Sequence, residues 1–230
     1  MYFDIPNPTV VVAGEGCRQV AGLFSVNPVV ALNQTEMDEL VQAIIYQQEG
    51  NCIIAHHDRP YTDNIIRYLG KRFLSFIDYY RYGVFGLDRD APTATPTHCA
   101  PYENPDGIPP GKSVILSPYA KSVVELPTAF WEGIATKYAG EGFCVYTNTT
   151  GAEKPIGGTA PLQVPISQMI PAVEHAGAFV GIRSGLCDVL STARCRKTVI
   201  FPDCHYSTTP HKVRDFFALP GWDAIVADRT

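Results

Sequence analysis

The sequence of 230 residues lacks the patterns that mark several common classes of protein. No apolar run approaches the roughly 18 residues needed to cross a bilayer, so no membrane-spanning segment is expected. Positive charge is not in excess, because 18 Lys and Arg residues stand against 23 Asp and Glu residues, for a net charge of -5. Nucleic acid is therefore not an expected partner. Residues 1–6 contain neither a basic segment nor a long apolar core, so no signal peptide is expected there.

Closely spaced cysteine pairs are also absent. The seven cysteines are scattered singly, without a C-x-x-C pair. This distribution is typical of reduced thiols and predicts a cytoplasmic protein without a disulfide framework or zinc site. Cys52 and Cys144 lie in apolar runs and are expected to be small core residues. His56 and His57 lack a third ligand at metal spacing, so no metal or other cofactor is expected.

Two familiar enzyme signatures are missing as well. No Gly-x-Ser-x-Gly nucleophile elbow occurs, and the adjacent Cys204 and His205 form no recognisable triad. Gly14-Glu-Gly16 follows a strand-like run but lacks the third glycine of a dinucleotide-binding loop and an acidic ribose partner. The sequence therefore favours neither that type of hydrolase nor a dinucleotide-dependent enzyme.

Strand-like and helix-like patterns alternate along the first part of the chain. Short apolar runs predict three strands, at 10–13, 29–32 and 52–55. Helical spacing of apolar residues follows at 35–48, where Thr35 and Glu36 form an N-terminal signature, and at 64–80. This alternation predicts a parallel sheet covered by helices.

Residues 89–112 differ in composition from the rest of the chain. Six of the 19 prolines fall between positions 92 and 110. Because proline fixes the backbone and removes a hydrogen-bond donor, this segment is expected to be an extended linker. The predicted organisation is a reduced N-terminal α/β domain over 1–88, a linker over 89–112 and a C-terminal α/β domain over 113–230.

The alternation resumes after the proline-rich segment. Apolar runs predict strands at 113–116, 143–146, 176–182 and 197–201. Helices are expected at 128–138, capped by Thr128, and at 165–175. The remainder after 201 is expected to be an irregular tail with a short helix near 213–217.

Polar, small or cationic residues follow three of these strands. Since the carboxyl ends of parallel strands share one edge of a sheet, these residues are expected to form a ligand site. Its members are Ser117, Lys121, Thr147, Asn148, Arg183, Ser184, Gly185 and Asp188. Lys121 and Arg183 would flank a phosphate, and the backbone N–H groups at Ser184 and Gly185 would bind it at the start of a helix. Thr147 or Asn148 could contact a sugar or base.

A simpler interpretation stays open. Strand ends lead into loops, and loops are polar in most proteins. In that case Ser184 is only the N-cap of a tight helix start, and Gly185 only supplies backbone freedom.

The order of motifs in the second half resembles the second domain of heptosyltransferase-like glycosyltransferases. It comprises Val-Ile-Leu-Ser-Pro-Tyr-Ala-Lys at 114–121, Leu126-Pro127, Phe130-Trp131-Glu132, and the strand, turn and helix at 179–190. The resemblance covers about residues 112 to 205. It implies two Rossmann-like domains in a GT-B architecture, with a nucleotide-activated sugar bound by the second domain and no metal.

The chain departs from that family at several positions. Ser117 stands where histidine is usual, Arg183 where aspartate is common, and Leu186 where proline is usual. The first half is also shorter than the family's acceptor domain. The chain is thus expected to be a compact variant or a piece of a longer protein.

The resemblance implies sugar transfer to a carbohydrate or glycoconjugate hydroxyl, which needs a positioned base. His57, oriented by Asp58, is the first candidate, and Glu15 is its rival. For either residue a capping or surface role is the alternative. The alternative for the whole chain is a non-catalytic nucleotide-sugar-binding or scaffold module.

Overall fold

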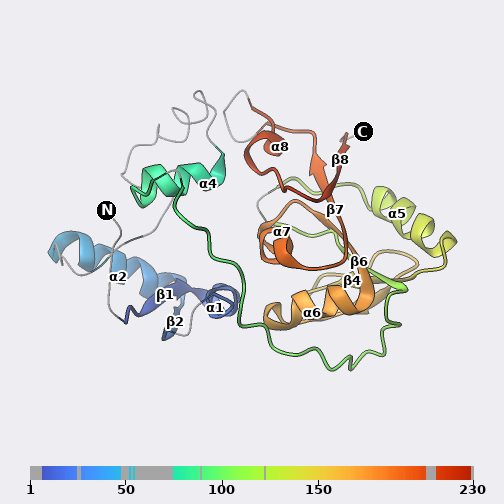
Figure 1. Cartoon of the computed structure of the whole chain (residues 1–230), viewed down its shortest axis with the longest axis horizontal. Coiled ribbons are helices and arrows are strands. Elements are labelled where there is room, and N and C mark those ends of the chain that lie inside the picture. Colours follow the sequence, from blue (N-terminus) through green and yellow to red (C-terminus); the bar gives the residue numbers. More distant parts are fainter. Residues whose placement is uncertain are drawn as a thin grey trace. The chain divides into compact units, whose positions relative to one another are not determined.

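A computed structural model of the chain describes residues 7–24, 27–47, 52, 54, 75–88, 90–121, 123–205 and 211–228. The chain divides into two compact units. The first unit comprises Met1–His98 and Ser207–His211, and the second comprises Cys99–Tyr206 and Lys212–Thr230. The first contains a two-stranded parallel sheet and the second a six-stranded parallel sheet (Figure 1). The expected α/β class is confirmed, with the larger sheet in the C-terminal half, consistent with a reduced GT-B-like fold.

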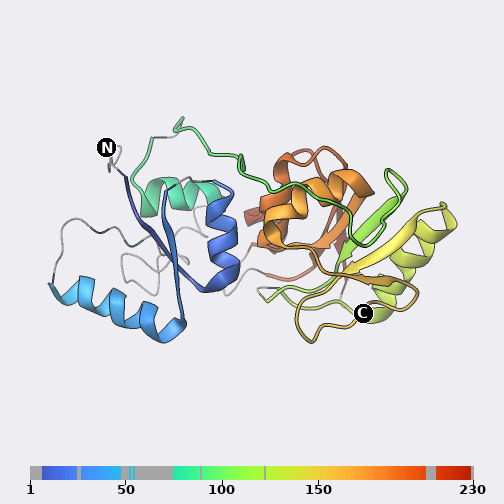
Figure 2. The ribbon, with the colours of Figure 1, turned by 90° about the horizontal axis from the view of Figure 1, so that it is seen from below.

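The described part of the first unit is built around one βαβ crossover. Strands β1 (Val10–Ala13) and β2 (Val29–Leu32) pair in parallel, from Val10 opposite Val29 to Ala13 opposite Leu32. Helix α1 (Gly14–Gly22) connects them and contacts both, as the blue elements of Figure 2 show. Helix α2 (Gln34–Gln47) follows β2. These elements agree with the predicted alternation of strands and helices.

Helix α2 begins differently from the prediction. Its capping residue is Asn33, whose side-chain Oδ1 accepts a hydrogen bond from the Glu36 N–H at 3.0 Å. The Glu36 carboxylate in turn accepts the Asn33 N–H at 2.8 Å. This reciprocal pair is a capping box, and it places Thr35 inside the helix instead of at its cap.

The rest of the first half lies mainly outside the described residues. The predicted strand at 52–55 is described only at Cys52 and Ile54, neither of them in a strand. Most of the predicted helix at 64–80 is outside as well. Its end is described as α4 (Phe76–Asp78), which continues as the π-helical segment η1 (Tyr79–Val84).

The second unit is a doubly wound parallel sheet. Its strand order is β5-β4-β3-β6-β7-β8, and every neighbouring pair is parallel. The strands are β3 (Ser113–Ser117), β4 (Cys144–Asn148), β5 (Ala160–Leu162), β6 (Gly177–Ile182), β7 (Arg196–Pro202) and β8 (Asp223–Ala227). The connecting helices are α5 (Thr128–Gly140), α6 (Ile166–Ala176), α7 (Gly185–Val189), the single 3₁₀ turn η2 (Leu190–Thr192) and α8 (Val213–Phe216).

Numbered within the unit, this strand order is 3-2-1-4-5-6, the order of the Rossmann fold. Two of its strands were not predicted, because β5 lies in a stretch expected to be a loop and β8 in the expected irregular tail. Helix α5 also starts one residue differently: Pro127 is its N-cap, and Thr128 is its first residue.

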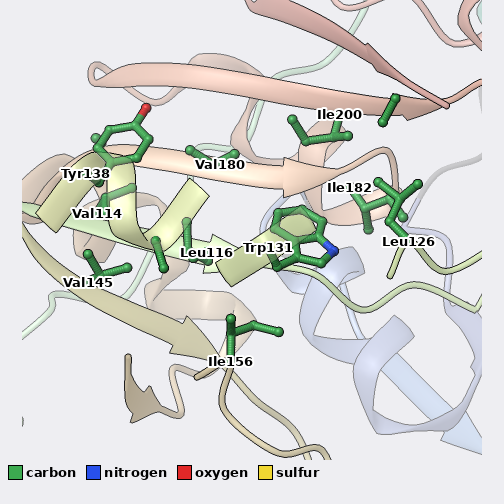
Figure 3. Close-up of a cluster of buried hydrophobic side chains, with 13 residues drawn as sticks. Val114, Leu116, Leu126, Trp131, Tyr138, Val145, Ile156, Val180, Ile182 and Ile200 are labelled. Carbon is green, nitrogen blue, oxygen red and sulfur yellow. The ribbon is translucent and has the colours of Figure 1, made fainter. Parts of the chain in front are cut away.

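One buried cluster joins α5 to the sheet (Figure 3). Trp131 of α5, 1% exposed, packs with Val114 and Leu116 of β3 and with Val180 and Ile182 of β6. Alternation along each strand places these residues on one face of the sheet. A buried tryptophan removes a large apolar area from water, so this cluster fixes the two central strands side by side.

The proline-rich segment is bonded to both units by its backbone. The N–H groups of Thr97 and His98 donate to the Leu23 carbonyl in the first unit, at 2.8 and 3.1 Å. Further along, the Gly111 N–H donates to the His175 carbonyl at 2.8 Å, and Ile108 is fully buried. The boundary between the units therefore lies inside the segment, between positions 98 and 99.

All seven cysteines are free thiols. Two of them were expected to be core residues and are not. Cys52 and Cys144 are exposed, and Cys144 is the first residue of β4. Cys187 is buried, and Cys195 is half-buried. Among the described residues, no helix combines the length and the apolar character that spanning a membrane requires.

Gly177 generates the first stability prediction. It ends α6 with a φ of 98°, and a Cβ atom there would lie 2.9 Å from the Cα of Gly111. We expect Gly177→Ala to lower the free energy of unfolding by about 1–3 kcal/mol, through strain in the left-handed region and this contact. Gly140→Ala is the control, since nothing lies within 4 Å of its Cβ position. Equal denaturation midpoints for the two variants would contradict the strained backbone and the close contact described for Gly177.

Thiol reactivity generates the second prediction. Burial raises the pKa of Cys195 to about 11, so at pH 8 only about one thiol in a thousand is ionised there. We expect maleimide to label the exposed Cys144 at pH 8 well before Cys195, and the labelling rate of Cys195 to climb as the pH rises toward 11. Peptide mass spectrometry after timed labelling measures both rates. Equally fast labelling of the two thiols at pH 8 would argue against the described burial.

Candidate functional site

The candidate site lies at the carboxyl edge of the larger sheet, between β3 and β6. The connection after β3 leads through α5 to β4 on one side, and the connection after β6 leads through α7 to β7 on the other. Two loops that leave adjacent strands in opposite directions open a crevice between them, and ligands bind there in sheets of this type. Ser117 pairs with Gly181 at this position. The topology thus brings the loops that begin after Ser117 and after Ile182 to one switch point.

Arg183 is the most extensively bonded side chain in this region. It is 7% exposed and forms a bidentate ion pair with Asp188, with N···O distances of 2.9 and 2.8 Å. Its Nε donates to the Phe217 carbonyl at 3.0 Å, and its Nη1 donates to the Ser184 carbonyl. The guanidinium also lies 5.1 Å from the centre of the Phe217 ring. Arg183 is therefore engaged within the protein and not directed to a ligand.

This geometry corrects the roles assigned to Arg183 and Asp188 from the sequence. A buried cation needs a carboxylate and several acceptors to offset its lost hydration, and here Asp188 and two carbonyls supply them. The pair closes the turn between β6 and α7 and bonds it to the segment after α8. We interpret Arg183 as the residue that positions this turn.

The turn itself retains free donors. Ser184 occupies the N-cap position in extended conformation, but its side chain makes no capping bond. The Cys187 N–H donates to the Ser184 carbonyl at 3.0 Å. In the described part of the chain no acceptor receives the N–H of Gly185 or Leu186. Gly185 is exposed, so these two N–H groups can reach a ligand.

Lys121 lies in the loop between β3 and α5. It is exposed, and no carboxylate of the described residues lies within 4 Å of its ammonium group. Ser117, at the end of β3, is 5% exposed and lies below this loop. An exposed lysine without a carboxylate partner is suited to an anion.

The two polar residues that end β4 differ in their availability. Thr147 is fully buried; its hydroxyl lies 2.6 Å from the Thr159 hydroxyl and accepts the Ile156 N–H at 3.1 Å. The expected contact of Thr147 with a sugar or base is therefore not supported by its geometry. Asn148 is half-buried, and its Oδ1 has no hydrogen-bond partner in the described residues. This Oδ1 is itself buried, and such an acceptor costs about 1–3 kcal/mol when left unsatisfied.

Sequence reasoning missed one connection at this edge. The Tyr119 hydroxyl donates to the Lys154 carbonyl at 2.5 Å and joins the loop after β3 to the loop after β4. The predicted parallel sheet made it foreseeable that these two loops follow adjacent strands. The bond from Tyr119 to the Lys154 carbonyl, 35 positions away, could not be predicted from the sequence.

The candidate bases belong to the first unit. Glu15 is exposed and bonds Arg18 through both carboxylate oxygens at 2.6 Å, with Gln19 at 3.3 Å. The hydrogen bond from Arg18 lowers the pKa of Glu15 further below neutrality, which disfavours proton abstraction. Glu15 is thus better explained as a stabiliser of α1. His57 and Asp58 lie outside the described residues.

Within the described ranges, no three His, Cys, Asp or Glu side chains are grouped so that they could hold an ion. The polar groups at the switch point are a lysine, an amide and backbone N–H groups, which suit an anionic ligand better than a cation.

The Arg183 network generates a third prediction. Arg183→Ala leaves the Ser184 and Phe217 carbonyls without their donor and should reduce the free energy of unfolding by about 2–4 kcal/mol. Arg214→Ala on α8 is the control, because Arg214 is half exposed and only 3.8 Å from Asp215, and surface pairs contribute about 0–1 kcal/mol. Urea denaturation of both variants measures the difference. An Arg183→Ala protein as stable as the control would show that the guanidinium is not structural.

Comparison with known proteins gives fold similarity only. No protein-family model matches the chain, and no curated protein matches its sequence. One similar solved structure is the bacterial iron-containing dodecameric glycosyltransferase TibC from enterotoxigenic E. coli H10407, with 16% identity, a TM-score of 0.48, and coverage of 90% of this chain and 64% of TibC. A second is the dodecameric iron-containing heptosyltransferase TibC in complex with ADP-D-beta-D-heptose, with 15% identity, a TM-score of 0.47, and coverage of 90% and 62%. The chain spans less than two thirds of the length of both structures.

Proposed function

We propose that this chain is a glycosyltransferase-like protein that binds a nucleotide-activated sugar at the carboxyl edge of its larger sheet. One observation supports the proposal: in the Rossmann strand order, the loop that contains Lys121 and the turn at 184–186 leave the adjacent strands β3 and β6 at the switch point. The motif resemblance supports the same ligand class. In this proposal the sugar passes to a carbohydrate-type hydroxyl, without a metal, in the cytoplasm.

The diphosphate is the part of the donor that these groups suit best. Lys121 offers an unpaired positive charge, and Gly185 and Leu186 offer backbone N–H groups that face no acceptor of the described residues. As the bond to the sugar breaks, negative charge grows on the departing diphosphate. Fixed donors already in place stabilise that charge without reorganisation. Arg183 contributes indirectly, because its ion pair with Asp188 keeps the turn in its shape.

The nucleoside or sugar is proposed to contact Asn148. Register places Leu116 of β3 opposite Thr147 of β4, so Ser117 and Asn148 follow side by side at the sheet edge. The buried, unsatisfied Oδ1 of Asn148 would accept a hydroxyl or N–H of the ligand after rotation of its side chain. The first unit would supply the base, with His57 favoured over Glu15 because Glu15 is committed to Arg18.

A non-catalytic binding or scaffold module is the second candidate. It is favoured by the small sheet of the first unit, which has two strands among the described residues. Both candidates require nucleotide binding, and they differ in turnover. If His57→Ala transfers sugar as fast as the parent protein, His57 is not the base; if the parent shows no transfer to any acceptor, the scaffold is favoured.

Nucleotide binding is the fourth prediction. A ligand present at about 100 times its Kd should add about 2.7 kcal/mol of stability, which a thermal-shift screen against UDP, GDP, ADP and CDP compounds detects. Lys121→Ala should weaken binding by about fivefold, as the loss of one charge-assisted contact does. Lys137→Ala, on an exposed part of α5, should not. The absence of a shift with every nucleotide, or equal affinity of the two variants, would reject the site.

A further inference from the structure

The loop between β4 and β5 is exposed and yet held in one shape by its own hydrogen bonds. The Thr149 N–H donates to the Leu162 carbonyl at 2.9 Å. The N–H and the hydroxyl of Thr150 both donate to the Glu153 carboxylate, at 2.7 and 3.0 Å. The Ile156 N–H bonds the buried Thr147 hydroxyl at 3.1 Å. Binding residues are commonly carried by loops that a rigid scaffold positions in this way.

Tyr119 fixes this loop against the neighbouring one. Its hydroxyl donates to the Lys154 carbonyl at 2.5 Å, and it precedes Lys121 by two residues. Burial raises the pKa of Tyr119, so the hydroxyl keeps its proton and remains a donor near neutral pH. The backbone of Lys154 is therefore held beside the loop that carries Lys121, at the carboxyl edge of the sheet.

Lys121 and Lys154 lie on the two loops that this bond joins. Lys121 and Lys154 are both exposed, and in the described part of the chain neither lies within 4 Å of a carboxylate. The adjacent Glu153 accepts two hydrogen bonds from Thr150, and after burial its charge and that of Glu125 are the further causes that raise the pKa of Tyr119. In a chain of net charge -5, two unpaired cations on adjacent fixed loops are suited to an anion of more than one charge.

We propose that Lys154 is a second cationic residue of the donor site, which binds the diphosphate together with Lys121, and that Tyr119 is its positioning residue. This inference rests on the nucleotide-sugar site proposed above. Lys154 supplies the second positive charge that the sequence had assigned to Arg183, whose guanidinium is bonded within the protein. A diphosphate carries more charge than a monophosphate, so Lys154 should matter most for the diphosphate.

The experiment is isothermal titration of the full chain with a nucleoside diphosphate that it binds and with the matching monophosphate. Lys154→Ala should weaken diphosphate binding by roughly 3- to 10-fold and monophosphate binding by less, while Lys154→Arg should bind like the parent. The control is Lys112→Ala, which removes an exposed lysine next to the amino end of β3 and should change neither affinity. Tyr119→Phe should reduce diphosphate affinity in the parent and have no further effect in Lys154→Ala.

The outcomes separate the two proposals. If the parent binds no nucleotide, the proposed function fails, and the inference fails with it. If Lys121→Ala weakens diphosphate binding and Lys154→Ala does not, the site stands and the role of Lys154 is rejected. If Lys154→Ala weakens nucleoside, monophosphate and diphosphate equally, its effect is structural, and the inference is again rejected.

Discussion

The buried guanidinium of Arg183 is the interaction on which the candidate site depends. It joins three segments of the second unit: the end of β6, helix α7 through Asp188, and the residue after α8 through the Phe217 carbonyl. A charge removed from water in this way is stable only while all its acceptors stay in place. The turn that carries the free N–H groups of Gly185 and Leu186 is therefore fixed before any ligand arrives. Donors that are already held in position lose little entropy when a ligand binds. The buried Arg183 therefore contributes by holding the turn, not by contacting the ligand.

The larger sheet turns this local order into a site. Its two central strands are joined by the Trp131 cluster, and their connections leave in opposite directions. The loops after β3 and β6 therefore diverge at the one place where the strand order reverses. The same arrangement puts Asn148 of β4 next to Ser117 of β3 at the carboxyl edge of the sheet. The site needs no unusual geometry beyond a parallel sheet, one buried ion pair and short loops.

The sequence predicts the central strands well because their physical signal is local. Residues 113–117 and 177–182 are buried on both faces, so they read as continuous apolar or small runs. The edge strands carry a weaker signal: β5 contains Pro161, and four of the five residues of β8 are exposed. The hydrogen-bond partners of a polar side chain are harder to predict than a strand, because they can lie far away in the sequence. Arg183 bonds a carbonyl 34 positions away, and Thr147 bonds a hydroxyl 12 positions away, so their unavailability could not be read from the motifs.

The backbone bonds of the proline-rich segment determine where the second unit can be separated as an independent piece. Ile108 is fully buried, and its carbonyl oxygen lies 2.9 Å from the imidazole Nε2 of His175. A shortened chain that started at β3 would thus lose the buried side chain of Ile108 and leave the His175 imidazole on α6 without its partner. A fragment that started at Cys99 would retain both contacts. A fragment of the second half made for crystallisation, calorimetry or domain exchange should accordingly begin upstream of Pro101 and Pro105. Composition alone would have assigned these prolines to a dispensable linker.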